Sequence, residues 1–185
     1  MTQMTESTQP TGAGQATHFA TDNMEGLQSL YIQHLRELYN AENQIVQALP
    51  VMMASATSPE LQQAFDMHKQ QSQTQADRLE KILQSLDKNP NGLMSKGMFA
   101  LIGEGQLLIK QKAPGDLLDA GLIAAAQHVE HYEIASYGTV SAWAKLLGRD
   151  DDLQLLLQSL EEEKQTDEKL TDLGKSTINP AAAKS

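Results

Sequence analysis

The sequence predicts an all-α protein, a four-helix up-down bundle with a long crossover between its second and third helices. Four segments repeat apolar residues at alternating intervals of three and four, which is the spacing of one face of an α-helix. The alternation typical of strands is absent. The connection over 89–115 is longer than two antiparallel neighbours need, so it indicates a crossover along the bundle that carries a short extra helix.

The first long helix should begin near Met24, and Pro50 should kink its last turns. Its inward stripe consists of Leu27, Tyr31, Leu35 or His34, Leu38, Glu42, Ile45, Leu49 and Met52. The pair Ser58 and Pro59 starts the second helix, because serine caps helix N-termini and proline suits the first helical position. Turn-forming residues over 87–92 end this helix.

The remaining helices follow from the same periodicity and from their end signals. A short helix is expected over 98–112, inside the crossover. The third long helix should run over 115–147, with Gly148 as the residue that stops it. The aspartates at 150–152 place negative charge on the first turn of the fourth helix, where the helix dipole favours it. That helix should end near Leu173.

The 185 residues suit a single domain, and the composition excludes several classes of function. We expect a disordered tail over 1–22, the bundle over 23–175 and a flexible tail over 176–185. The net charge of −10 and a pI near 4.8 argue against a nucleic-acid surface. No apolar run approaches the roughly 18 residues that cross a bilayer, so no membrane partner is expected. The absence of cysteine fits a reducing, cytoplasmic compartment.

Polar side chains interrupt the apolar stripe near the centre of each long helix. The interruptions are Glu42 in the first helix, His68, Gln71 and Gln75 in the second, Glu130 and Glu133 in the third, and Glu163 and Asp167 in the fourth. In each hairpin the two sets lie at similar distances from the turn, so antiparallel packing places them at one level. The sequence therefore predicts a polar layer inside the bundle.

Carboxylates buried in one layer repel one another, and each is costly unless something pairs with it. An interhelical salt-bridge network is the alternative, but no Lys or Arg occupies a matching stripe position. One or two divalent cations would neutralise the layer, and oxygen ligands with an imidazole suit iron or manganese. The candidate ligands are Glu42, His68, Glu130, Glu133, Glu163 and Asp167. Thr166 shares the face of Asp167, and His68 has the alternative of a hydrogen-bonded core histidine.

Three further residues are candidates to hydrogen-bond to the ligands without binding the metal: Gln71, Tyr39 and His131. Each has an alternative, and for Gln71 it is to bind the metal itself. Core packing is the other reading for Tyr39, as for Tyr137, and a subunit contact is the other reading for His131.

Three segments resemble the YciE/YciF stress-protein family of the ferritin-like superfamily. They are Ala-Ala-Gln-His-Val-Glu-His-Tyr-Glu-Ile-Ala-Ser-Tyr-Gly at 125–138, Glu-Glu-Lys-Gln-Thr-Asp-Glu-Lys-Leu-Thr-Asp-Leu at 162–173 and Leu-Tyr-Asn-Ala-Glu-Asn-Gln at 38–44. The resemblance implies a ferritin-like bundle, a homodimer, a dinuclear metal centre and a bacterial protein associated with general or osmotic stress. The chain departs from the superfamily because the second and fourth helices lack its Glu-x-x-His pair. Neutral Gln71 stands where an acidic residue is expected.

Two functions follow as hypotheses. The first is a di-iron or mixed Fe/Mn oxidoreductase of ferroxidase or peroxide-consuming type, with O₂ or H₂O₂ as substrate and zinc able to replace the native metal. Glu42 and Glu163 would be terminal ligands, and Glu130 or Glu133 would bridge the ions. The second is a non-enzymatic, dimeric stress or interaction protein with a vestigial or single-metal site, a reading that neutral Gln71 keeps open.

Overall fold

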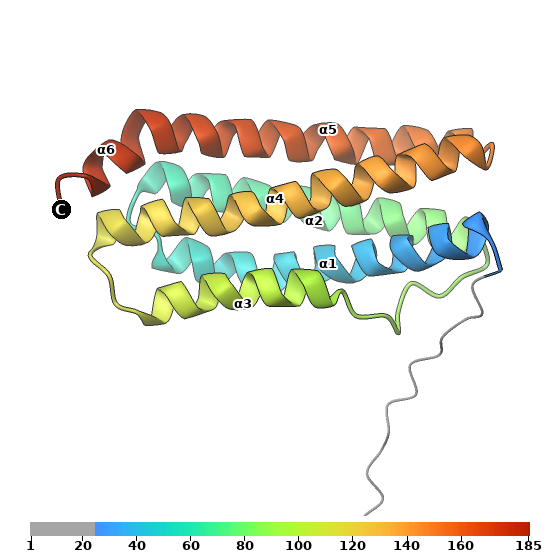
Figure 1. Cartoon of the computed structure of the whole chain (residues 1–185), viewed down its shortest axis with the longest axis horizontal. Coiled ribbons are helices and arrows are strands. Elements are labelled where there is room, and N and C mark those ends of the chain that lie inside the picture. The colour runs from blue at the N-terminus through green and yellow to red at the C-terminus, as the bar shows by residue number, and fades with distance from the viewer. Residues whose placement is uncertain (1–24) are drawn as a thin grey trace, which may run out of the picture.

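The protein is a bundle of long helices, as the apolar periodicity predicts. The computed structural model describes residues 25–185, and the disordered tail expected at 1–22 lies outside the described residues. The helices are α1 (Leu27–Ser55), α2 (Pro59–Ser85), α3 (Lys96–Lys110), α4 (Gly115–Leu146) and α5 (Asp150–Leu173). The described part of the chain contains no strand, so the all-α prediction is confirmed. Figure 1 shows the four long helices lying lengthwise, with α3 along one end of α1 and α4.

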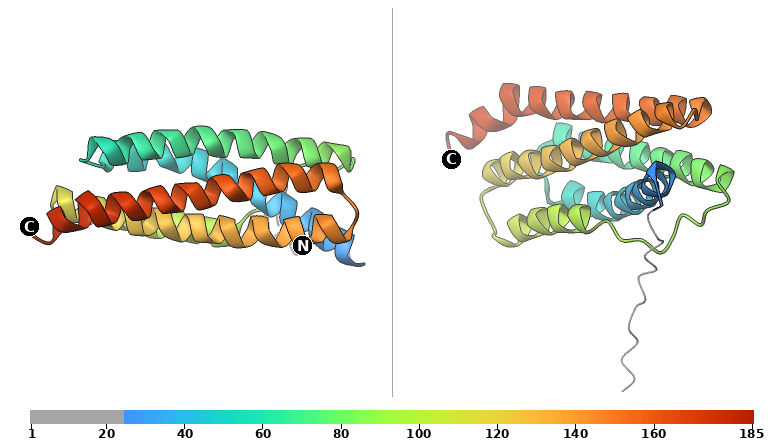
Figure 2. Two further views of the ribbon diagram at one scale, coloured as in Figure 1. Left: turned by 90° about the horizontal axis from the view of Figure 1, so that it is seen from above. Right: turned by 45° about the vertical axis from the view of Figure 1, so that its right-hand side comes forward.

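The crossover sets the directions of the helices. The backbone and hydroxyl of Thr57, between α1 and α2, donate hydrogen bonds to Asp119 near the start of α4. At the opposite end Arg149, just before α5, donates to Ser85 at the end of α2. Therefore α2 and α4 begin at the same end and run in the same direction, while α1 and α5 run against them. Figure 2 shows α5 alongside α4 from two further directions.

The local signals at the helix ends act as the sequence predicts. The hydroxyl of Ser58 accepts a hydrogen bond from the backbone N–H of Leu61, and Pro59 is the first residue of α2. Pro50 lies inside α1, which continues to Ser55, and the kink expected there stays a prediction. Gly148 has a φ of +67°, the left-handed conformation that glycine adopts most readily at a helix end. The short crossover helix was expected over 98–112, and it occupies Lys96–Lys110 behind a Ser95 cap.

The C-terminal region differs from the sequence prediction. A flexible tail was expected over 176–185, but a π-helical turn at Gly174–Ile178 and the helix α6 (Asn179–Ala182) continue α5. Pro180 cannot donate the regular α-helical hydrogen bond, and the chain reaches it through the wider turn. The side chain of Ile178 is buried in the same apolar cluster as Ile123. This packing holds the segment against the bundle.

The apolar core is divided into two clusters. One cluster surrounds Phe65 and contains residues such as Ile45 and Leu122, while the other surrounds Leu79 and contains Tyr31 and Leu156. On every long helix, buried polar residues lie between the two sets: Glu42 in α1, His68, Ser72 and Gln75 in α2, Glu130 and Glu133 in α4, and Glu163 in α5. The bundle thus has a polar layer between two apolar halves.

Candidate metal centre

Four residues of the polar layer converge at one point in the bundle. Each offers a ligand atom, and these atoms all lie within 4.8 Å of one another: His68 from α2, Glu130 and Glu133 from α4, and Glu163 from α5. Their side chains are buried, the most exposed being His68 at 3%. Three long helices therefore contribute to one group of an imidazole and three carboxylates.

The fourth long helix contributes Glu42, whose side chain is also fully buried. The hydroxyl of Tyr137 donates a hydrogen bond to its Oε1 atom. Burial raises the pKa of Glu133 well above its ordinary value, and the negative charge of Glu42 raises it further. Five predicted ligands thus lie in one layer, as equal distances from the turns implied.

Most of the ligand atoms have no hydrogen-bond partner among the described residues. This holds for both oxygens of Glu130 and Glu133, for Oε2 of Glu42 and Glu163, and for both ring nitrogens of His68. Nδ1 of His68 lies 3.1 Å from Oε1 of Glu130 without hydrogen-bond geometry. Buried polar atoms are nearly always paired, because an unpaired one costs roughly 1–3 kcal/mol. Unpaired carboxylate oxygens that converge with an imidazole fit a bound divalent cation, and the donor types suit iron or manganese.

The electrostatics of the layer lead to the same interpretation. Burial, together with the charge of Glu163, raises the pKa of Glu42 and Glu130 well above the ordinary range. Burial raises the pKa of Glu163 to about 7 and lowers the pKa of His68 to about 4, so the imidazole is neutral at pH 7. A cation in the layer would favour the ionised carboxylates, and the neutral imidazole has a lone pair available to bind it.

Hydrogen bonds separate the carboxylates into two kinds. Tyr137 occupies one oxygen of Glu42, and the Gln75 side-chain amide donates to Oε1 of Glu163. Glu130 and Glu133 have no such donor among the described residues, so both of their oxygens are available. The first kind can offer one oxygen and the second kind two.

The structure does not bring Asp167 into the cluster. Its side chain accepts a hydrogen bond from Gln127 at 3.1 Å and lies 3.6 Å from the ring of His131, which is 68% exposed. Thr166 is the residue that faces inward at this level, since successive helical residues point about 100° apart. His131 therefore lies next to Asp167 and does not contact the five clustered candidate ligands.

The other two supporting candidates also lie outside the cluster. Gln71 is half-buried, and its side-chain oxygen accepts a hydrogen bond from the hydroxyl of Thr166 at 3.3 Å. Tyr39 is half-buried and packs against the Leu79 cluster. The role of Tyr39 at the ligands stays a prediction.

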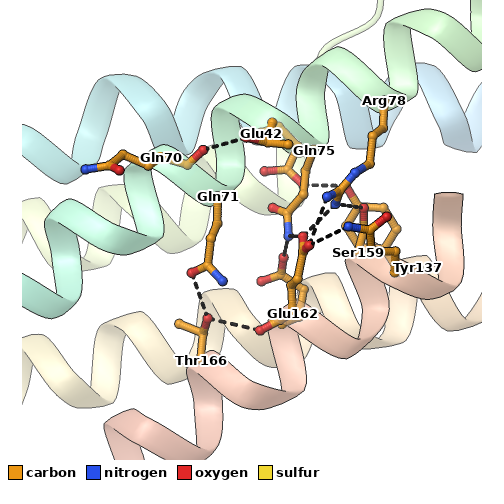
Figure 3. Close-up of polar contacts among 12 residues, drawn as sticks. Glu42, Gln70, Gln71, Gln75, Arg78, Tyr137, Ser159, Glu162 and Thr166 are labelled. Atoms are coloured by element: carbon orange, nitrogen blue, oxygen red, sulfur yellow. Dashed lines mark hydrogen bonds and ion pairs between the residues drawn. The ribbon is translucent and has the colours of Figure 1, made fainter.

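Two features near the ligands were not predicted as parts of the site. Gln75, noted only as a polar interruption, is fully buried and donates to Glu162 as well as to Glu163. The guanidinium of Arg78 forms two hydrogen bonds with Glu162, at 2.6 and 2.9 Å. Figure 3 shows Arg78 of α2 and Glu162 of α5 meeting between the two helices. Burial opposes ionisation of Glu162, yet the bonds from Arg78 hold its pKa below the ordinary value. The sequence did contain a signal for this contact, because Gln75 occupies a stripe position one helical turn before Arg78.

Comparisons with known proteins identify similar chains over nearly the whole described region. The sequence model of the family "Domain of unknown function (DUF892)" matches residues 26–183. Protein YciF of Escherichia coli K12 is 38% identical over 161 residues, which cover 86% of this chain and 97% of that protein. None of the helices within residues 25–185 combines the length and apolar character needed to cross a membrane.

Solved structures give the same result. The crystal structure of the E. coli stress protein YciF matches with a TM-score of 0.81 at 38% identity, covering 84% of this chain and 99% of that one. YcfI from Rhodopseudomonas palustris matches with a TM-score of 0.78 at 38% identity, covering 82% and 96%. A Xanthomonas campestris protein at 19% identity shares the fold, with a TM-score of 0.70 over 86% of this chain and 98% of that one.

Proposed function

Since this chain belongs to the DUF892 family, the YciE/YciF stress-protein family, we propose that it holds a dinuclear iron or Fe/Mn centre in its core and acts under stress as a ferroxidase or peroxide-consuming protein. The observation that carries the proposal is the meeting of His68, Glu130, Glu133 and Glu163 with their ligand atoms unpaired. An apolar layer would be cheaper to bury, so the ionisable residues indicate a bound partner.

The hydrogen bonds suggest how the residues would divide the task. Glu42 and Glu163 each have one oxygen occupied by a protein donor, so they suit terminal ligation through the other oxygen. Glu130 and Glu133 have both oxygens available and suit bridging. His68 would supply a neutral nitrogen. Two redox-active ions would supply the electrons that reduce O₂ or H₂O₂.

Metal stoichiometry tests the proposal directly. Protein purified without chelators would be titrated anaerobically with Fe(II), and binding of two ions per chain is expected. Replacing both bridging candidates, Glu130→Gln with Glu133→Gln, should abolish two-ion binding, while Glu161→Gln, an exposed carboxylate on α5, serves as the matched control. Two-ion binding that survives the double replacement would defeat the assignment.

Turnover is a separate measurement. Mixing the Fe(II)-loaded protein with O₂ or H₂O₂ in a stopped-flow instrument should give a fast oxidation phase that the double replacement removes. An oxidation rate equal to that of free Fe(II) would defeat the enzymatic part of the proposal and leave metal binding intact.

The second candidate function is a non-enzymatic interaction protein that works as a homodimer. It is favoured by α3, on which Phe99 and Leu107 are each 61% exposed, because large apolar side chains in water often mark an interaction surface. Light scattering would measure the oligomeric state. Absence of an oxidation phase, together with a dimer that Phe99→Ser and Leu107→Ser disrupt, would favour this function. We further propose a cytoplasmic location, which the lack of cysteine fits.

A further inference from the structure

The ligand cluster is closed to solvent. Its side chains are at most 3% exposed, so an ion that reaches them must displace some part of the surrounding wall. Opening a path needs the least energy where a few side chains can rotate and no helix has to move. Two polar contacts close the seam between α2 and α5, one on each side of the cluster. They are Gln71 with Thr166 and Arg78 with Glu162.

A groove lies in this seam, and two of its lining residues, Gln71 and Thr166, each follow a candidate ligand by one helical turn. It has a volume of about 300 Å³, and its walls include Ala64, Met67 and Leu170. Glu60 and Lys169 also line it, so one carboxylate and one ammonium balance its charge. The groove opens to solvent, and a hydrated divalent cation fits its size.

A polar contact between two helices forms part of the groove wall. Gln71 and Thr166 both line the groove, and each lies three residues beyond a ligand on its helix, Gln71 after His68 and Thr166 after Glu163. Residues at this spacing are neighbours on a helix face. Figure 3 shows the two side chains facing each other across the seam, joined by their hydrogen bond.

This contact is weak and rich in oxygen. The hydroxyl of Thr166 lies 3.3 Å from Oε1 of Gln71, at the long limit for a hydrogen bond, and it also lies 3.0 Å from the backbone oxygen of Glu162. The hydroxyl can keep the second bond when the first opens. Rotation of the Gln71 side chain would then expose two neutral oxygen atoms to an incoming cation, one helical turn from the ligands.

The other side of the cluster is closed far more firmly. Arg78 and Glu162 form a two-bonded ion pair, and Gln75 adds a bond to the same carboxylate at 3.1 Å. The guanidinium also contacts the hydroxyl of Ser159 at 3.2 Å. Opening this side would break several charge-assisted bonds at once, and would place the guanidinium charge in the path of the cation.

We propose that divalent cations enter and leave the cluster through the α2–α5 groove, passing between Gln71 and Thr166. The proposal rests on the proposed metal-binding function and adds the route. A change confined to a route alters the rates of binding and release by the same factor and leaves the equilibrium constant unchanged, because both directions cross the same barrier.

The absence of cysteine from the sequence allows a reversible block. In the Ala64→Cys variant the new thiol lies in the groove, and a neutral benzyl methanethiosulfonate reagent would attach a bulky group there as a disulfide. Co(II) is the probe, with binding followed by its visible absorbance and release followed by chelator capture. We expect both rates to fall by about tenfold or more at constant Kd, and a reducing agent to restore them.

A matched control and a second variant complete the test. Gln73→Cys carries the same label on an exposed position of α2 and should leave both rates unchanged. Gln71→Ala removes the larger side chain of this contact and keeps the hydroxyl of Thr166, so both rates should rise together at constant Kd. Unchanged rates in labelled Ala64→Cys, or a shift in Kd without matched rate changes, would overturn the route. Failure of the unmodified protein to bind Co(II) would instead remove the metal function, and the route with it.

Discussion

The hydroxyl of Tyr137 on α4 donates a hydrogen bond to the carboxylate of Glu42 on α1, and both side chains are fully buried. The bond links two helices inside the polar layer and fixes one of the two oxygens of Glu42. Burial and the neighbouring charge of Glu42 raise the pKa of Tyr137 well above its ordinary value, so the phenol keeps its proton and stays a donor.

Replacing Tyr137 with Phe should therefore weaken both stability and metal binding. Removing the donor leaves a buried carboxylate oxygen unpaired, at a cost of about 1–3 kcal/mol in the free energy of unfolding. A ligand that has lost its orienting partner typically loses about tenfold or more in metal affinity. Urea denaturation and Co(II) titration measure the two effects. Tyr132→Phe on the same helix, which loses a bond to Ser95, is the control and should leave metal affinity unchanged.

The metal-free protein should become more stable at high pH when Glu163 is replaced by Gln. Burial raises the pKa of Glu163 from 4.5 to about 7, so its contribution to stability is present below pH 4.5 and is lost as the pH rises through 7. This pKa difference corresponds to a gain of about 3 kcal/mol in the free energy of unfolding of the variant at pH 8. Most of the gain should be absent at pH 5.

Denaturation of both proteins with excess chelator at pH 5 and pH 8 measures this gain, and Glu161→Gln should show none of it. Saturating Co(II) should reverse the order of stability, because the variant has lost a ligand. A variant that is less stable than the parent protein at pH 8 without metal would show that Glu163 is paired by the protein itself.

The long helices and the polar layer between them could be predicted from residue spacing in the sequence. Apolar spacing located the long helices, and equal distances from the two tight turns brought Glu42, His68, Glu130, Glu133 and Glu163 into one layer. These inferences depend only on helix geometry, which varies little between proteins. The layer could therefore be predicted before any contact was known.

The details that depend on helix rotation could not be predicted in the same way. Thr166 and Asp167 are adjacent, and a small change in the rotation of α5 decides which of them faces inward. The pairing of Arg78 with Glu162 depends on two side chains at the edge of the stripe, where periodicity gives no signal. Ile178 is the last residue of a π-helical turn, which shifts the register of the apolar face.

Asp119 should contribute strongly to folding and not to metal binding. It is buried at the start of α4 and accepts hydrogen bonds from the backbone N–H groups of Thr57 and Ser58 and from the hydroxyl of Thr57, at 2.7–2.8 Å. Asp119→Ala leaves these donors without a partner, so the free energy of unfolding should fall by about 3 kcal/mol. Exposed Asp116 in the same turn is the control, and its replacement by Ala should cost less than about 1 kcal/mol.

Thermal unfolding of the Asp119 and Asp116 variants gives the stability difference, and Co(II) titration of the folded proteins gives the affinity. A large loss of affinity in Asp119→Ala would show that the end of the bundle and the polar layer are energetically linked.

The ion pair between Arg78 and Glu162 should stabilise the α2–α5 seam only as a pair. Both side chains are partly exposed, at 14% and 22%, so solvent reduces their attraction, but the two-bonded geometry and the Gln75 contact favour a measurable coupling. Arg78→Met alone leaves the negative charge of Glu162 without a positive partner next to buried Glu163 and should destabilise the protein. The double replacement Arg78→Met with Glu162→Met should recover part of the loss, because no charge is then left without a partner.

A double-mutant cycle of unfolding free energies measures the interaction, and a coupling of about 1 kcal/mol is expected, falling as salt rises. A coupling near zero would mean that the pair closes the seam by its shape, and that its charges contribute no net stability. In that case a neutral pair of similar volume would seal this side of the cluster equally well.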